Sequence, residues 1–376
     1  MVGEGSSRRR LRRLAPLGAA LLMWCLGSAS VNAATGWWQS APGPPRILSA
    51  VASNSTYTTL AISGGVAGWL DSRSGNFALA SSTSKVAFVA AKGDSGLILE
   101  STGELYTISS TGAPQRLQRL PGRPLGLAIS AGANPVAAAL TNRGVYRGEL
   151  GSRLRLVASA FPLQTPLTLA GPVTSSEPFA LATAHGVFLL GSRGPLRRVQ
   201  NSPRLGAHAH IAELGNGTIL VGDDRGLISA YYRGRWTPIF QLLPYGGLGG
   251  VPQLDGIVGV GLDAAYVATS GFGTLLTPDG GYSWYRASPP SISGTILALA
   301  TLGPIYGTRP VGLVLAVSPS RVFLHRLEAL PTPPIYSGAT ETAQLWGTAL
   351  VTALAAALVI CLMWLIRRRH RRRLFV

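Results

Sequence analysis

The feature that most constrains this chain is a repeat of about forty residues that runs through most of its 376 residues. Each unit contains a short apolar run, a small polar break with a glycine, and a second apolar run. Ser320 stands at the place of the glycine in the last unit. The equivalent positions recur every 38 to 47 residues, and the glycines are Gly65, Gly103, Gly144, Gly186, Gly226 and Gly273.

Such units are typical of a four-stranded sheet that packs radially around a channel. A glycine at each break suits a tight hairpin turn, where a positive φ is needed. The sequence therefore predicts an all-β fold, a single β-propeller over residues 34–328. The spacing predicts about seven four-stranded blades, and six or eight also fit it.

Charge is concentrated at the two ends of the chain. Lys and Arg number 33 against 15 Asp and Glu, a formal net charge of +18. Eleven of the arginines lie in the first thirteen and the last ten residues, and the remainder of the chain carries about +8. That remainder has no basic face interleaved with aromatic residues, which argues against a nucleic-acid partner.

The N-terminus has the parts of a secretory signal. A run of arginines is followed by the apolar residues 14–30, with small side chains before an expected cleavage after Ala33. The arginine run also fits a twin-arginine export motif, and an uncleaved anchor is the alternative. We therefore expect a signal peptide over residues 1–33 and an extracytoplasmic main domain.

The C-terminus predicts a membrane anchor. Residues 343–366 carry no charge, and 24 residues at about 1.5 Å each are long enough to cross a bilayer. A Pro-rich stalk precedes them at 329–342, and a basic tail follows at 367–376. By the positive-inside rule the tail is cytoplasmic, which gives a single-pass, type I protein of the plasma membrane. The arginines that carry this topology signal are Arg367, Arg368, Arg369, Arg371, Arg372 and Arg373.

Cysteine is confined to the two apolar terminal segments, at Cys25 and Cys361. The predicted ectodomain therefore has no disulfide, thiolate metal site or cysteine nucleophile.

One turn carries a specific motif. Residues 277–284, TPDGGYSW, follow the pattern S/T-x-D-x-G-x-x-W, with Thr277, Asp279, Gly281 and Trp284 at its fixed positions. This resembles the Asp box of the bacterial neuraminidase repeat propellers, a group with WD40/YVTN-like architecture that includes sialidases, sortilin-type receptors and photosystem II assembly-factor propellers. The resemblance implies a structural turn, in which the Asp279 carboxylate bonds turn amides and Trp284 packs between blades.

No catalytic set converges in the sequence. A sialidase-like site uses an arginine triad, a tyrosine nucleophile and acidic residues, and nothing in the spacing assembles them. His208 and His210 share one side of a strand but lack a third metal ligand. Asp223 and Asp224 favour a turn over a Ca²⁺ site. Glu213 belongs to no recognisable constellation. We therefore predict no catalytic residue, no cofactor and no metal.

Two further groups are of interest. Asn54 and Asn216 begin glycosylation sequons, which matter only in a glycosylating secretory pathway. A surface patch for a partner could come from Arg143, Arg147, Arg153 and Arg155.

The combined prediction is a membrane-anchored β-propeller that acts as a binding or scaffold module. Its ligand is a protein partner, a membrane complex or a cell-envelope glycan, bound through loops at one propeller face. The alternatives are a sialidase-like glycoside hydrolase of the cell envelope and an assembly or stability factor for a membrane complex.

Overall fold

The computed structural model describes residues 35–42, 48–80, 85–159, 166–172, 178–191, 196–206, 208–241, 254–269, 273–287, 298–302, 313–317, 321–329 and 336–337. The predicted signal peptide, membrane span and basic tail lie outside these residues. Within the described ranges, no helix is long and apolar enough to cross a membrane.

The described strands form seven sheets. Six are built from strands that follow one another along the chain and pair antiparallel. The first three are β2 (Leu48–Val51), β3 (Thr58–Ser63), β4 (Val66–Asp71) and β5 (Phe77–Leu79); β6 (Val86–Lys92), β7 (Ser95–Glu100), β8 (Glu104–Ser109) and β9 (Gln115–Arg119); and β10 (Pro124–Ile129), β11 (Val136–Thr141), β12 (Gly144–Glu149) and β13 (Arg155–Ser159).

The next three sheets follow the same order. They are β14 (Pro166–Ala170), β15 (Phe179–Thr183), β16 (Gly186–Leu190) and β17 (Arg197–Arg198); β18 (His210–Glu213), β19 (Ile219–Gly222), β20 (Leu227–Tyr232) and β21 (Arg235–Gln241); and β22 (Leu254–Gly259), β23 (Ala265–Thr269), β24 (Gly273–Thr277) and β25 (Ser283–Arg286). A fifth strand, β29 (Tyr336–Ser337), pairs with β25 and comes from the segment expected to be the stalk.

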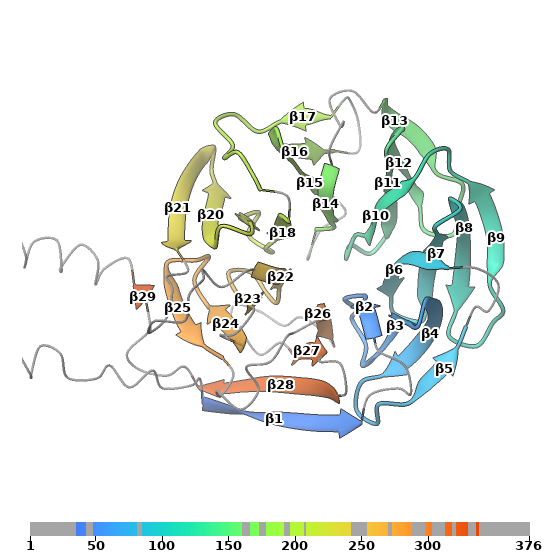
Figure 1. Ribbon diagram of the computed structural model, residues 1–376, viewed down its shortest axis with the longest axis horizontal. Coiled ribbons are helices and arrows are strands. Elements are labelled where there is room, and N and C mark those ends of the chain that lie inside the picture. The colour runs from blue at the N-terminus through green and yellow to red at the C-terminus, as the bar shows by residue number, and fades with distance from the viewer. Residues whose placement is uncertain are drawn as a thin grey trace, which may run out of the picture. The chain divides into compact units, whose positions relative to one another are not determined.

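The seventh sheet joins segments from the two ends of the described chain. Its order is β1–β28–β27–β26, from β1 (Thr35–Pro42), β28 (Arg321–Ala329), β27 (Leu313–Val317) and β26 (Ala298–Leu302). Strand β1 runs antiparallel to β28 along its whole length (Figure 1). The repeat in the sequence did not predict this closing strand.

The sheets are arranged in a ring. Their first strands contact one another in the order β2, β6, β10, β14, β18, β22 and β26, and β26 returns to β2. These strands surround the centre of the ring in Figure 1. The predicted architecture, a single all-β propeller, is therefore confirmed.

The second strand of each sheet explains the continuous apolar runs in the sequence. Strands β15 and β23 are buried at every residue, and β3 and β11 at all but their first. Both faces of these strands pack against neighbouring sheets, so the apolar residues do not alternate with polar ones. The outer strands β9 and β13 are largely exposed, and their apolar pattern is correspondingly weak.

The predicted turn glycines all lie where the second strand of a sheet leads to the third. Gly65, Gly103, Gly186 and Gly226 have φ of +85°, +89°, +120° and +73°, as expected. Gly144 differs, because its φ is outside the left-handed region. A Cβ at Gly144 would lie 2.4 Å from the Ala158 carbonyl oxygen, so the close approach of β13 explains this glycine. Gly273 is the first residue of β24.

Candidate functional site

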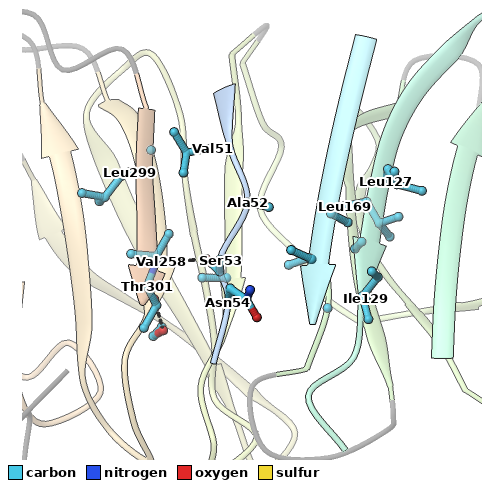
Figure 2. A pocket seen from close by; sticks show the side chains of 18 of the residues that line it. Val51, Ala52, Ser53, Asn54, Leu127, Ile129, Leu169, Val258, Leu299 and Thr301 are labelled. Atoms are coloured by element: carbon cyan, nitrogen blue, oxygen red, sulfur yellow. Dashed lines mark hydrogen bonds between the residues drawn. The ribbon is translucent and has the colours of Figure 1, made fainter. Parts of the chain in front are cut away.

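The centre of the ring contains a cavity of about 860 Å³. It is lined by residues of β2, β6, β10, β14, β18, β22 and β26, the first strands of all seven sheets. Figure 2 shows part of its wall, with Leu127, Ile129 and Leu169 on one side and Val258, Leu299 and Thr301 on the other. The cavity is therefore a property of the whole ring, since each sheet contributes to its wall.

Most of the cavity wall is small or aliphatic, and it holds four ionisable side chains: Lys92, His210, Glu213 and Asp255. The described part of the lining contains neither arginine nor tyrosine. The arginine triad and tyrosine nucleophile of a sialidase therefore do not meet among these residues. Groups of three or more metal-ligating side chains are also absent from the described ranges.

Glu213 is the last residue of β18 and is only 5% exposed. Its Oε2 atom is buried and has no hydrogen-bond partner among the described residues. Because burial disfavours the charged form, the pKa of the Glu213 carboxyl rises from 4.5 to about 7. This carboxyl therefore titrates near neutral pH inside the cavity wall.

Asp255 reaches the cavity from a β-bulge. The register between β22 and β23 shifts between Leu254 and Gly256, so Asp255 has no partner in the ladder. A bulge of this kind redirects a side chain relative to its neighbours. The buried Oδ2 atom of Asp255 also has no described partner, and burial raises the pKa of this carboxyl to about 6.

His210 begins β18 and lies beside the start of β22. Burial is the main cause that lowers its pKa to about 4; the nearby His208 lowers it further, and a hydrogen bond with the Leu254 backbone opposes the shift. At neutral pH His210 is therefore uncharged. It does not supply a positive charge to Glu213 or Asp255.

Lys92 lies at the end of β6 and has a partner of its own. Its ammonium donates a 2.6 Å hydrogen bond to the Ala131 carbonyl oxygen, and burial lowers its pKa. No ion pair joins Lys92 to either carboxylate in the described part of the chain.

Asn54 joins three sheets at the edge of the cavity. Its side-chain amide donates to the Gly93 carbonyl oxygen at 2.8 Å and accepts from the Gly93 amide at 2.6 Å. Its backbone amide donates to the Thr301 carbonyl oxygen at 2.8 Å. Asn54 is 6% exposed, so this sequon asparagine is a structural residue of the ring, whereas Asn216 is exposed.

The Thr277–Trp284 turn connects β24 to β25. The Asp279 carboxylate accepts a 2.7 Å bond from the Ser283 amide, and the Thr277 hydroxyl accepts one of 2.7 Å from the Gly281 amide. The Trp284 indole donates to the Gly281 carbonyl oxygen at 2.9 Å. Trp284 is fully buried in a cluster with residues of the preceding sheet, including Leu220 and Ile228. These contacts hold the turn and the interface between two sheets, and they lie outside the cavity lining.

Two of the other polar groups are structural. Asp223 is buried, and its carboxylate accepts from the amides of Gly206 and Arg225, so it closes a turn as predicted. Arg147 is also buried and donates to the Gly191 carbonyl oxygen. The prediction that Arg147 belongs to a surface patch of arginines is therefore wrong. The other three arginines of that predicted patch, Arg143, Arg153 and Arg155, are exposed.

The sequence did not identify the cavity carboxylates. No sequence pattern marks Asp255, and Glu213 belongs to no recognisable constellation in the sequence. The available signal is a carboxylate at the end of the short run HIAE, which the fold places on the inner strand of a sheet.

The ring of sheets around a central cavity defines the chain as a β-propeller, the fold of the superfamily that its motif resembled. Among solved structures it is similar to YCF48 bound to D1 peptide, with 13% identity, a TM-score of 0.57, and coverage of 79% of this chain and 99% of that chain. It is also similar to virginiamycin B lyase from Staphylococcus aureus, with 10% identity, a TM-score of 0.58, and coverage of 78% and 100%. The WD40 repeats of RRP9 match with 13% identity, a TM-score of 0.56, and coverage of 80% and 99%.

At these identities the likeness shows the fold alone. No protein-family model matches the chain, and no curated protein matches it.

Proposed function

We propose that this chain is a membrane-anchored, extracytoplasmic binding module that holds a protein partner on its propeller. The single observation that carries the proposal is the cavity of about 860 Å³, to which all seven sheets contribute. Its lining combines apolar residues with eleven polar or ionisable side chains, and such a mixture can position a ligand and select it.

The chemistry of the lining favours binding over catalysis. Glu213 and Asp255 come from neighbouring sheets, and neither has a described partner that would act as a nucleophile or complete a catalytic group. A similar fold in YCF48 binds a D1 peptide, which supports a peptide or protein as the class of ligand.

Membrane attachment rests on the sequence. Residues 343–366 are apolar throughout, and six arginines follow within seven residues, which supports a span with its tail in the cytoplasm. The arginine-rich start of the chain supports export of the propeller.

The test of partner binding is affinity purification of the full-length tagged chain in mild detergent. A matched bait lacks residues 35–329 and keeps both terminal segments. We expect at least one protein to be recovered with the full chain and not with the deletion bait. Equal recovery of every protein with both baits would contradict the proposed function.

The test of topology is protease treatment of sealed cells. We expect the propeller to be digested from outside, while an epitope placed after Val376 survives. A protected propeller would contradict the extracytoplasmic location.

A further inference from the structure

Glu213 is a cavity residue whose carboxylate lacks a hydrogen-bond partner for one of its oxygens among the described residues. The residue is only 5% exposed, and the described residues offer no donor to its Oε2 atom. Buried carboxylates in proteins are normally paired or hydrogen-bonded, because an isolated buried charge is costly. An unpartnered oxygen in a cavity wall therefore points to a ligand that brings the missing donor.

With Glu213 and Asp255 ionised, Lys92 protonated and His210 neutral, the four ionisable side chains of the cavity lining sum to a formal charge of −1. On β22, the first strand of the neighbouring sheet, the Oδ2 atom of Asp255 also has no partner among the described residues. His210 is uncharged at neutral pH, because its pKa falls to about 4, and Lys92 keeps its positive charge while it donates to the Ala131 carbonyl oxygen. Asp223 follows β19, the strand that pairs with β18, and its carboxylate accepts hydrogen bonds from the backbone amides of Gly206 and Arg225.

Part of the remaining lining suits an alkyl chain. Ala52, Ala90, Ala128, Leu169 and Ile257 line the same cavity and have no polar side-chain atoms. A metal ion fits poorly, because the described residues hold no group of three or more ligating side chains. An organic cation needs fewer charged contacts and gains from apolar walls along its stem.

We propose that the central cavity binds an ammonium or guanidinium group carried on a slender alkyl chain, with Glu213 as its carboxylate partner and Asp255 as a second negative charge in the same lining. A basic side chain of the partner protein is the source that follows from the proposed function, and a free amine has the same chemistry. The inference deepens the proposed function, since it names the group that the partner inserts.

The test is calorimetric titration of the full-length chain in mild detergent with two amine probes. One is the peptide acetyl-Gly-Lys-Gly-amide, and the other is n-butylamine. The peptide with norleucine in place of lysine has nearly the same stem without the charge. Tighter binding of the lysine peptide than of butylamine assigns the cation to a protein side chain, and the reverse order assigns it to a free amine.

We expect binding at pH 8 that weakens about tenfold or more at pH 5, because Glu213 and Asp255 take up protons over this range. The norleucine peptide and the Glu213→Gln variant should each lose about tenfold or more in affinity, as expected for a charge-assisted hydrogen bond. Glu149→Gln, an exposed carboxylate at the end of β12, is the matched control and should bind as the unchanged chain does.

Equal binding of the lysine and norleucine peptides, full affinity in Glu213→Gln, or no saturable binding of either amine at millimolar concentration would overturn the inference. Urea unfolding of each variant at pH 8 separates a lost site from a lost fold. The proposed function has its own test, because a partner that distinguishes the full chain from the deletion bait can survive failure of the amine site.

Discussion

Replacing Glu213 by glutamine should stabilise the propeller in alkaline solution and have little effect in acid. The buried Oε2 atom of this carboxyl has no donor in the described part of the chain, and burial raises its pKa from 4.5 to about 7. The folded protein therefore binds this proton more tightly than the unfolded chain does. Folding is favoured by the protonated form below pH 4.5, and this stability is lost as the pH rises to about 7.

The magnitude follows from the two pKa values. At about 1.4 kcal/mol for each pH unit, the change from 4.5 to about 7 corresponds to about 3 kcal/mol of unfolding free energy. The side chain is only 5% exposed, so screening by solvent reduces this value little. Glutamine has nearly the same shape as glutamate but does not ionise, so the variant does not lose this stability as the pH rises.

The assay is urea unfolding of the full-length chain in mild detergent at pH 5 and pH 8, followed by tryptophan fluorescence. We expect the advantage of Glu213→Gln over the unchanged chain to grow by about 2 to 3 kcal/mol between the two pH values. The exposed Glu149→Gln control should change stability by less than about 0.5 kcal/mol at either pH. A Glu213→Gln variant that is equally or less stable at pH 8 would refute the reasoning, because the carboxyl would then have a stabilising partner.

Three further predictions concern the ring itself, and urea unfolding at pH 7 measures each. Asn54→Ala should lower the unfolding free energy by about 2 to 4 kcal/mol, because it removes both bonds from the buried Asn54 side chain to the partly buried Gly93 amide and carbonyl; a loss below 1 kcal/mol would contradict this role. Trp284→Ala should cost about 3 to 5 kcal/mol, as it empties the fully buried space between two sheets, and a near-neutral effect would show that the sheets do not depend on it. Gly144→Ala should cost about 1 to 3 kcal/mol through the 2.4 Å approach to the Ala158 oxygen; Gly256→Ala, whose Cβ would meet only Leu299 at 3.8 Å, is the control and should cost less than 1 kcal/mol.

The local sequence pattern was sufficient to predict the propeller fold and the positions of its turns. Short apolar runs with glycine between them specify hairpins, because backbone conformation and hairpin geometry depend on neighbours in sequence. The contacts of Thr277, Asp279 and Gly281 also lie within one eight-residue turn. The pattern was less reliable at Gly144, since the reason for that glycine is the carbonyl of a different strand.

The amino-acid sequence by itself determined the all-β class and the repeated sheet, because both arise from contacts within about forty residues. Only the tertiary structure decided that β1 completes the last sheet, that Asn54 holds three sheets together, and that Glu213 and Asp255 line one cavity. The physical reason is distance along the chain. A carboxylate acquires its pKa and its partners from residues that ring closure brings beside it, and no local pattern records which residues those are.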